Sequence, residues 1–258
     1  MVNQDRSVTF DKRRILLNDI KSLSKDKKRQ LLMITNMLRD LNLLQKYMIF
    51  SMKGLDERNS IKVDENITTY LFLLKMLISK VHEMWEFIKR HKLQQNKRDL
   101  TLETCQALSI LEQFYDGQKV GKTFNFIRNK FGFHYEWLPD VEDEIEKGMH
   151  VQDFEMLLSN QDTGNNIFIS SNRIMLGVIL TEMLKNGYTG DHRALTSQLI
   201  EDSLEAAKLF SLFYTTYLIQ DVLKGIKVEK INEISIDAPF MSEVSLPLIV
   251  KKDVQTGG

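Results

Sequence analysis

The chain has 258 residues, of which 43% are hydrophobic and 27% charged, which excludes bulk disorder and supplies enough apolar material for a buried core. Its 35 lysine and arginine residues balance 35 aspartate and glutamate residues, so no global field draws the protein onto nucleic acid or an anionic membrane. Any nucleic-acid contact must therefore come from a local patch. At this length we expect a single helical domain over residues 1–258.

The sequence favours a cytoplasmic protein with no membrane contact. Its first residues lack the apolar run of a signal peptide, and no later stretch has eighteen uncharged apolar residues in succession. The one cysteine, Cys105, cannot form an internal disulfide and has a core-like position in a predicted helix. A reducing compartment fits this pattern.

Two long helices are predicted in the first third of the chain. Apolar residues recur at intervals of three and four over residues 26–52, as in a helix that buries one face. The same spacing predicts a helix over residues 67–90, where Lys75, Lys80 and Glu83 interrupt the apolar run. The polar residues 53–66 have no period and are predicted as a loop. The two helices should pack on each other.

Two further helices are predicted in the middle of the chain. One follows the polar residues 93–100, with Gly117 as a left-handed stop. The next begins near Lys119, and Pro139 limits its length. The predicted buried stripe of this helix consists of Val120, Phe124, Ile127, Phe131 and His134.

The second half of the chain changes character. Residues 154–170 contain two short runs of strand-forming residues around a turn rich in Asn, Asp and Gly, which predicts a β-hairpin insertion. A capped helix should then run from about residue 172 to 184, followed by a long helix over residues 192–223. Residues 227–258 are expected to form an irregular C-terminal extension. The predicted fold class is thus all-α, an antiparallel helical bundle with a small β-hairpin insertion.

Several kinds of site have no sequence support. The glycines form no phosphate-binding loop, and the GxSxG turn of serine hydrolases is missing from the sequence. The five histidines have no metal-ligand spacing, so we expect no metal and no cofactor. His82-Glu83 is interpreted as part of a solvated helix face.

One segment carries residues suited to RNA chemistry, Arg128-Asn129-Lys130-Phe131-Gly132-Phe133-His134. Cleaving RNA without a metal needs a group that takes the 2′-hydroxyl proton near neutral pH, and a cation that stabilises charge on the pentacoordinate phosphorus. Histidine suits the first role because its pKa is near 6.5, and arginine suits the second through its fork of donors.

The segment resembles the motif of the HEPN (higher eukaryotes and prokaryotes nucleotide-binding) superfamily, an arginine and a polar residue followed at short spacing by a histidine. The resemblance implies a helical bundle that forms a homodimer, so that two motifs build one metal-independent endoribonuclease site. By that resemblance Arg128 would stabilise the phosphorane, Asn129 would orient the phosphate or the histidine, and His134 would act as general acid or base. It also implies a toxin-antitoxin or defence role, with an antitoxin or regulatory protein as partner.

Helical geometry restricts how this motif could work. At about 100° per residue, Arg128 and His134 lie roughly 120° apart on a straight helix. Either Gly132 loosens the helix and turns His134 toward Arg128, or each residue meets its counterpart from a second subunit. Lys122 and Lys130 could hold phosphate and Tyr135 could stack on a base, although solvated lysines and packed aromatics look the same in sequence.

A second interpretation of the same residues stays open. His134 could be a core-edge histidine bonded to backbone, with Arg128 paired to the acidic residues 140–146. The protein would then be a non-catalytic helical interaction module. The balanced charge of the whole chain favours this alternative.

Overall fold

The computed structural model describes residues 7–53, 60–132 and 169–237, and its fold is mostly helical with one small antiparallel sheet. This agrees with the predicted fold class at the level of an all-α protein with a pair of strands. The α-helices described are α1 Leu17–Ser22, α2 Lys25–Lys53, α3 Ser60–Arg90, α4 Leu102–Tyr115, α5 Lys119–Ile127, α7 Ile169–Lys185 and α8 His192–Tyr217.

The predicted helices are found close to their expected bounds. The main difference is α3, which begins at Ser60 and so includes seven residues that we predicted as loop. Asn66, which is one of these seven residues, is buried. Tertiary packing therefore stabilises the helix over residues whose local pattern is polar. Gly117, Gly187 and Gly225 all have the positive φ expected of glycines that end helical segments.

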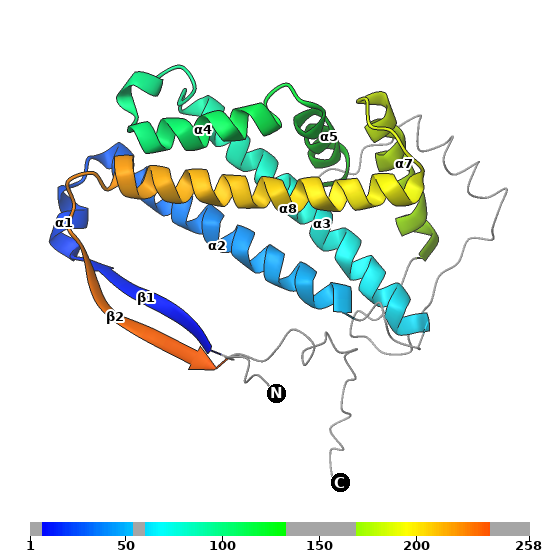
Figure 1. Cartoon of the computed structure of the whole chain (residues 1–258), viewed down its shortest axis with the longest axis horizontal. Coiled ribbons are helices and arrows are strands. Elements are labelled where there is room, and N and C mark those ends of the chain that lie inside the picture. Colours follow the sequence, from blue (N-terminus) through cyan, green and yellow to red (C-terminus); the bar gives the residue numbers. More distant parts are fainter. Residues whose placement is uncertain (1–6, 54–59, 133–168, 238–258) are drawn as a thin grey trace, which may run out of the picture.

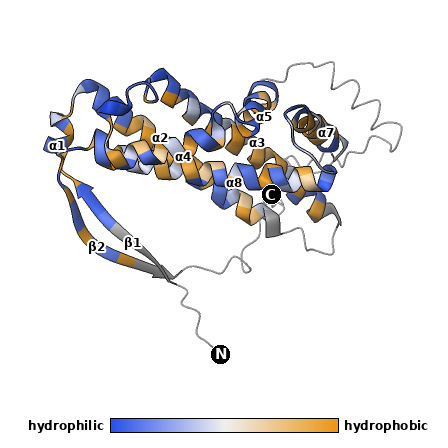
Figure 2. Cartoon of the chain, turned by 45° about the horizontal axis from the view of Figure 1, so that its top comes forward, coloured by the Kyte–Doolittle hydropathy of each residue, from blue (hydrophilic) through white to orange (hydrophobic). Residues whose placement is uncertain are grey.

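Helix α3 is the centre of the core. It packs against α2, α5, α7 and α8, and α4 lies along α8 (Figure 1). Figure 2 shows hydrophobic and hydrophilic residues alternating along these helices, as expected when each buries one face. The largest completely buried side chains include Trp85, Tyr115, Tyr214, Phe87, Phe124, Phe210 and Phe213. An aromatic cluster thus joins α3, α4, α5 and α8.

The carboxylate of Asp221 joins the end of the last helix to the start of α4. It lies in the π-helical turn Leu218–Val222, which continues α8. One of its oxygens accepts from the backbone nitrogen of Thr101 at 2.9 Å, and the other accepts from the Thr104 hydroxyl at 2.5 Å. Thr101 is the N-cap residue of α4 and makes no capping bond with its own side chain. A residue 117 positions away from Thr104 therefore holds the first turn of this helix in place.

The strands are in a different place from the predicted hairpin. β1 Ser7–Ile15 pairs antiparallel with β2 Val228–Asp237, with a register shift at Lys12/Arg13. Residues 228–237 are thus a regular strand, and the expected irregular extension is wrong over this stretch. Figure 1 shows the two strands as an arm beside the helices. Residues 154–168 of the predicted hairpin lie outside the described part of the chain, and residues 169 and 170 begin α7.

In the described part of the chain, no helix is long and apolar enough to cross a membrane.

Candidate functional site

A polar cleft lies where α5 and the turn that follows it pack against α3. Its volume is about 420 Å³, and it is open to solvent. The side chains that line it are His82, Glu83, Glu86 and Arg90 from α3, and Asn125, Arg128 and Asn129 from the other wall. The first two residues of the predicted RNA motif thus enter the same cleft.

A change of helix type presents these two residues. Helix α5 ends at Ile127, and Arg128–Gly132 forms a π-helical turn, whose hydrogen bonds span five residues instead of four. Ile127 and Phe131 remain buried through this turn, as their apolar spacing predicts. The helix therefore does widen up to Gly132, while His134 lies outside the described residues. Such π turns are frequent at functional sites.

Arg128 is oriented by a short relay of amides. Its Nη1 donates to Oδ1 of Asn129 at 2.8 Å, and Nδ2 of Asn129 donates to Oδ1 of Asn125 at 2.9 Å. Nε of Arg128 is buried, and among the described residues it has no hydrogen-bond partner. Leaving a buried donor unpaired costs about 1–3 kcal/mol, so an arginine in this state is typical of a functional position.

His82 places an imidazole in the wall of the cleft. From the sequence we interpret this residue as part of a solvated helix face. That interpretation is wrong, because His82 is only 7% exposed. Its Nδ1 lies 3.1 Å from the Tyr115 hydroxyl, and its Nε2 lies 3.9 Å from Oε1 of Glu86. Burial raises the pKa of Tyr115 far above its usual value, so this hydroxyl keeps its proton and can donate it to Nδ1. The proton of the neutral ring can lie on either nitrogen: on Nε2 when Tyr115 donates to Nδ1, or on Nδ1 when Nδ1 donates to the Tyr115 oxygen, which leaves Nε2 free to accept a proton.

Burial also sets the charge of this histidine. It lowers the pKa of His82 below the usual 6.5, and the positive charge of Arg128 lowers it further, while Glu86 has the opposite effect. His82 is therefore neutral at pH 7. A neutral imidazole in a solvent-accessible cleft can accept a proton.

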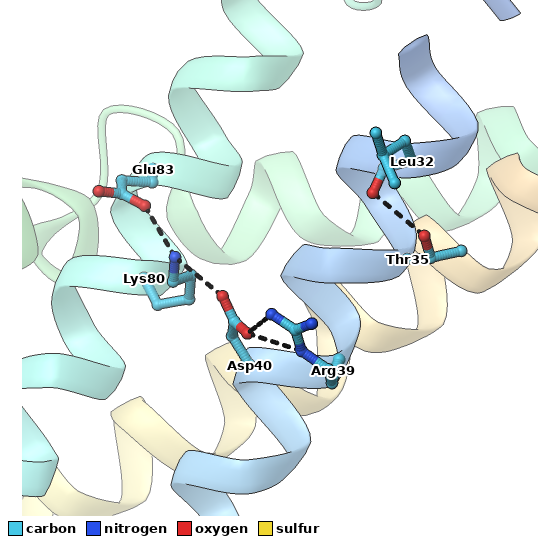
Figure 3. A network of polar contacts seen from close by, with 6 residues as sticks. All are labelled: Leu32, Thr35, Arg39, Asp40, Lys80 and Glu83. Carbon is cyan, nitrogen blue, oxygen red and sulfur yellow. Dashed lines mark hydrogen bonds and ion pairs between the residues drawn. The ribbon is translucent and has the colours of Figure 1, made fainter. Parts of the chain in front are cut away.

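Glu83, one of the two carboxylates that line the cleft, belongs to a network of ion pairs that reaches α2 (Figure 3). Nζ of Lys80 lies 3.1 Å from Glu83 and 3.4 Å from Asp40, and Arg39 donates to the other oxygen of Asp40 at 2.8 Å. Burial alone would raise the pKa of Asp40, but its bonds to Arg39 and the charge of Lys80 lower it below the usual value. Asp40 therefore stays charged and fixes the lysine that positions Glu83.

The charges that line the cleft are balanced. Glu83 and Glu86 face Arg90 and Arg128, so the cleft has no strong net field. Nε of Arg90 donates to the backbone oxygen of Glu86 at 3.3 Å, which directs its guanidinium along α3. An anionic ligand would have to be held by directed bonds from the guanidinium groups more than by overall charge.

The other predicted site residues are not among the side chains that line the cleft in the described part of the chain. Lys122 is exposed and lies on the same face of α5 as Asn125, beside the cleft. Lys130 is partly buried and does not line the cleft. His134 and Tyr135 lie outside the described residues. Within the described residues no group of three or more His, Cys, Asp or Glu side chains could hold a metal ion.

Sequence reasoning missed the contribution of α3. His82, Glu86 and Arg90 are spaced four residues apart, which places them on one face of a helix. A polar stripe on an otherwise apolar helix was the available signal, and reading His82-Glu83 as an adjacent pair concealed it.

The chain was compared with protein-family models, with curated proteins and with solved structures, and none of them matches it.

Proposed function

We propose that the cleft between α3 and α5 binds RNA and is one half of a metal-independent endoribonuclease site of HEPN type, completed by a second copy of the chain. The observation that carries this proposal is the state of Arg128. Its guanidinium is oriented by Asn129, lines a polar cleft, and keeps one buried donor without a partner among the described residues. A guanidinium held at the wall of an open cleft can donate to a bound oxyanion.

The reaction is a transesterification within the RNA. A base takes the proton of a 2′-hydroxyl, the resulting oxygen attacks the adjacent phosphorus, and the bond from phosphorus to the 5′-oxygen breaks. The leaving 5′-oxygen takes up a proton, which gives a 2′,3′-cyclic phosphate and a 5′-hydroxyl end. Arg128 would stabilise the charge on phosphorus, and Asn129 would hold Arg128 in place. His134 is the proton carrier that the motif implies, and His82 is an imidazole that lines the cleft.

This proposal predicts a specific loss of activity in Arg128→Lys. Lysine keeps the charge but loses the planar fork, so the rate should fall by about 10²-fold or more. His134→Ala should lose activity on the same scale, because it removes a proton carrier. Cleavage of a fluorescent RNA in excess chelator measures both, and the product ends are identified by mass spectrometry.

Matched controls separate chemistry from folding. Arg193→Lys and His192→Ala change the same residue types at exposed positions at the start of α8, and both should keep the wild-type rate. All variants should keep the thermal midpoint within a few degrees. Activity that needs magnesium, or that survives both Arg128→Lys and His134→Ala, would contradict the proposal. Full activity in a chain that sediments as a monomer would contradict the two-copy site.

The pH dependence identifies which histidine accepts the proton. Because burial lowers the pKa of His82, it is neutral at pH 7 and becomes protonated only as pH falls below 6.5. If His82 is the base, the rate should fall as pH drops through that lowered pKa, and His82→Gln should remove this acidic limb. A limb that persists in His82→Gln and disappears in His134→Ala would assign the base to His134 alone.

A non-catalytic interaction module is the second candidate function. It is favoured by the cleft's two carboxylates, which offset its two guanidinium groups and weaken attraction for a polyanion. In that case wild-type protein should neither cleave RNA nor bind it with the strong salt dependence of phosphate contacts. Such a protein could be part of a toxin-antitoxin or defence system without being its nuclease.

A further inference from the structure

Lys75 is buried, although lysine side chains in proteins are almost always exposed. It lies on α3, where its position in the sequence suggested a polar break in the apolar face. In the structure it is only 8% exposed. Its neighbours come from α3, α7 and α8, and they are Leu71, Leu74, Ile78, Asn172, Met175, Leu176, Ile179 and Leu199. The amine is thus enclosed almost entirely by apolar side chains.

The amine has a weak partner in place of a carboxylate. Nζ lies 3.2 Å from the thioether sulfur of Met175, which is a poor acceptor. The one amide in the pocket wall, Asn172, donates to the Thr68 hydroxyl at 2.9 Å. Among the described residues no acidic side chain pairs with Lys75. An unpaired ammonium ion is strongly disfavoured in such surroundings.

The surroundings of Lys75 shift its amine toward the neutral form. Burial lowers the pKa of Lys75 from its usual 10.5, and no neighbouring charge opposes the effect. A neutral primary amine has a free electron pair on nitrogen, and desolvation in an apolar pocket is one way in which proteins activate lysine as a nucleophile toward carbonyl carbon.

The pocket beside the amine is small. Its volume is about 10 Å³, space for one water-sized group, and it is partly open to solvent. This restricts the carbonyl compounds that can reach Nζ without displacing core side chains. An aldehyde with a single carbon fits that limit, whereas an aromatic aldehyde does not.

We propose that Lys75 is a covalent binding site for a one-carbon aldehyde, which it holds as an imine. The nitrogen electron pair attacks the carbonyl carbon, the carbonyl oxygen takes up the two protons that the nitrogen gives up, and loss of water leaves a carbon–nitrogen double bond. Water regenerates the free amine by the reverse route. The imine resides in the pocket because an apolar wall tolerates a neutral group better than a charged one. This site is independent of the RNA cleft.

Brief reductive methylation of the full chain at pH 7 tests the site. The probe is ¹³C-formaldehyde with cyanoborohydride, which transfers hydride to the carbon of the imine once the imine nitrogen takes up a proton and so leaves a stable methylamine; peptide mass spectrometry gives the rate at each lysine. Lys75 should be modified at least about tenfold faster than the exposed Lys25 and Lys122, because burial favours its neutral, nucleophilic amine. Equal or slower modification of Lys75 would overturn the proposal.

Two comparisons on the wild-type chain make the result specific to the pocket, and they require no variant to fold. In concentrated urea the advantage of Lys75 should vanish, since the desolvating walls are lost. With benzaldehyde in place of formaldehyde, Lys75 should be modified no faster than Lys25. An advantage that persists in urea would assign the reactivity to the local sequence, and fast modification by benzaldehyde would refute the one-carbon limit.

Discussion

Replacing Phe210 with alanine is expected to cost about 3–5 kcal/mol of the free energy of unfolding, the scale measured for large aromatic side chains removed from cores. Phe210 is completely buried on α8. Its ring centroid lies 5.4 Å from that of Tyr115 and 6.3 Å from that of Trp85, both in edge-on geometry, and 6.4 Å from that of Tyr214. Alanine removes these contacts and leaves a cavity between α3, α4 and α8.

The measurement is urea unfolding followed by circular dichroism. A domain is typically stable by about 5–15 kcal/mol, so Phe210→Ala could remove a third or more of the total. Leu212→Ala is the matched control, because Leu212 lies two residues away on α8 and is 50% exposed. It should cost less than about 1 kcal/mol. If both variants unfold at the same urea concentration, the aromatic cluster is not the centre of the core.

The second large effect is expected for Gly121→Ala. An added Cβ at this position would lie 2.2 Å from the backbone oxygen of Tyr115, far inside van der Waals contact. Because the clashing atom belongs to the backbone, it cannot turn aside as a flexible side chain would. Helix α5 must therefore shift away from the end of α4. We expect a loss of about 3 kcal/mol, the upper part of the range for overpacking, although alanine is the better helix former.

Thermal unfolding measures this effect, with Lys122→Ala as the control on the next, exposed position of α5. A loss of 3 kcal/mol corresponds to a fall of roughly 6–12 °C in Tm for a chain of this size. The control should change Tm by only about 1–2 °C. A Gly121→Ala protein as stable as its control would show that α5 does not approach α4 this closely.

Local pattern by itself determined most of the helical framework. Intervals of three and four between apolar residues identified α2, α4, α5 and α8, because a helix that buries one face must repeat with its own turn. Gly117 marked the end of a helical segment for an equally local reason, since glycine reaches positive φ without strain. The motif chemistry likewise singled out Arg128 and Asn129, which do share a cleft.

Only the tertiary structure decided which strands exist. β1 and β2 come from opposite ends of the described chain, with Ser7 opposite Asp237. No local pattern carries such a pairing, because the hydrogen bonds that define a strand belong to its partner. The same reason explains the start of α4, where Asp221 accepts from Thr101 and Thr104 from more than a hundred residues away.

Burial of polar side chains also depended on the tertiary fold. His82 and Lys75 both interrupt an apolar helix; the sequence pattern placed His82 on a solvated face and marked Lys75 only as a break in the apolar run. Two different surroundings bury them instead: Tyr115 of α4 accompanies His82, and Met175 of α7 covers Lys75. A sequence states which side chains can ionise. The free energy of ionisation depends on the solvent and charges around each group, and only packed helices from distant parts of the chain set those surroundings.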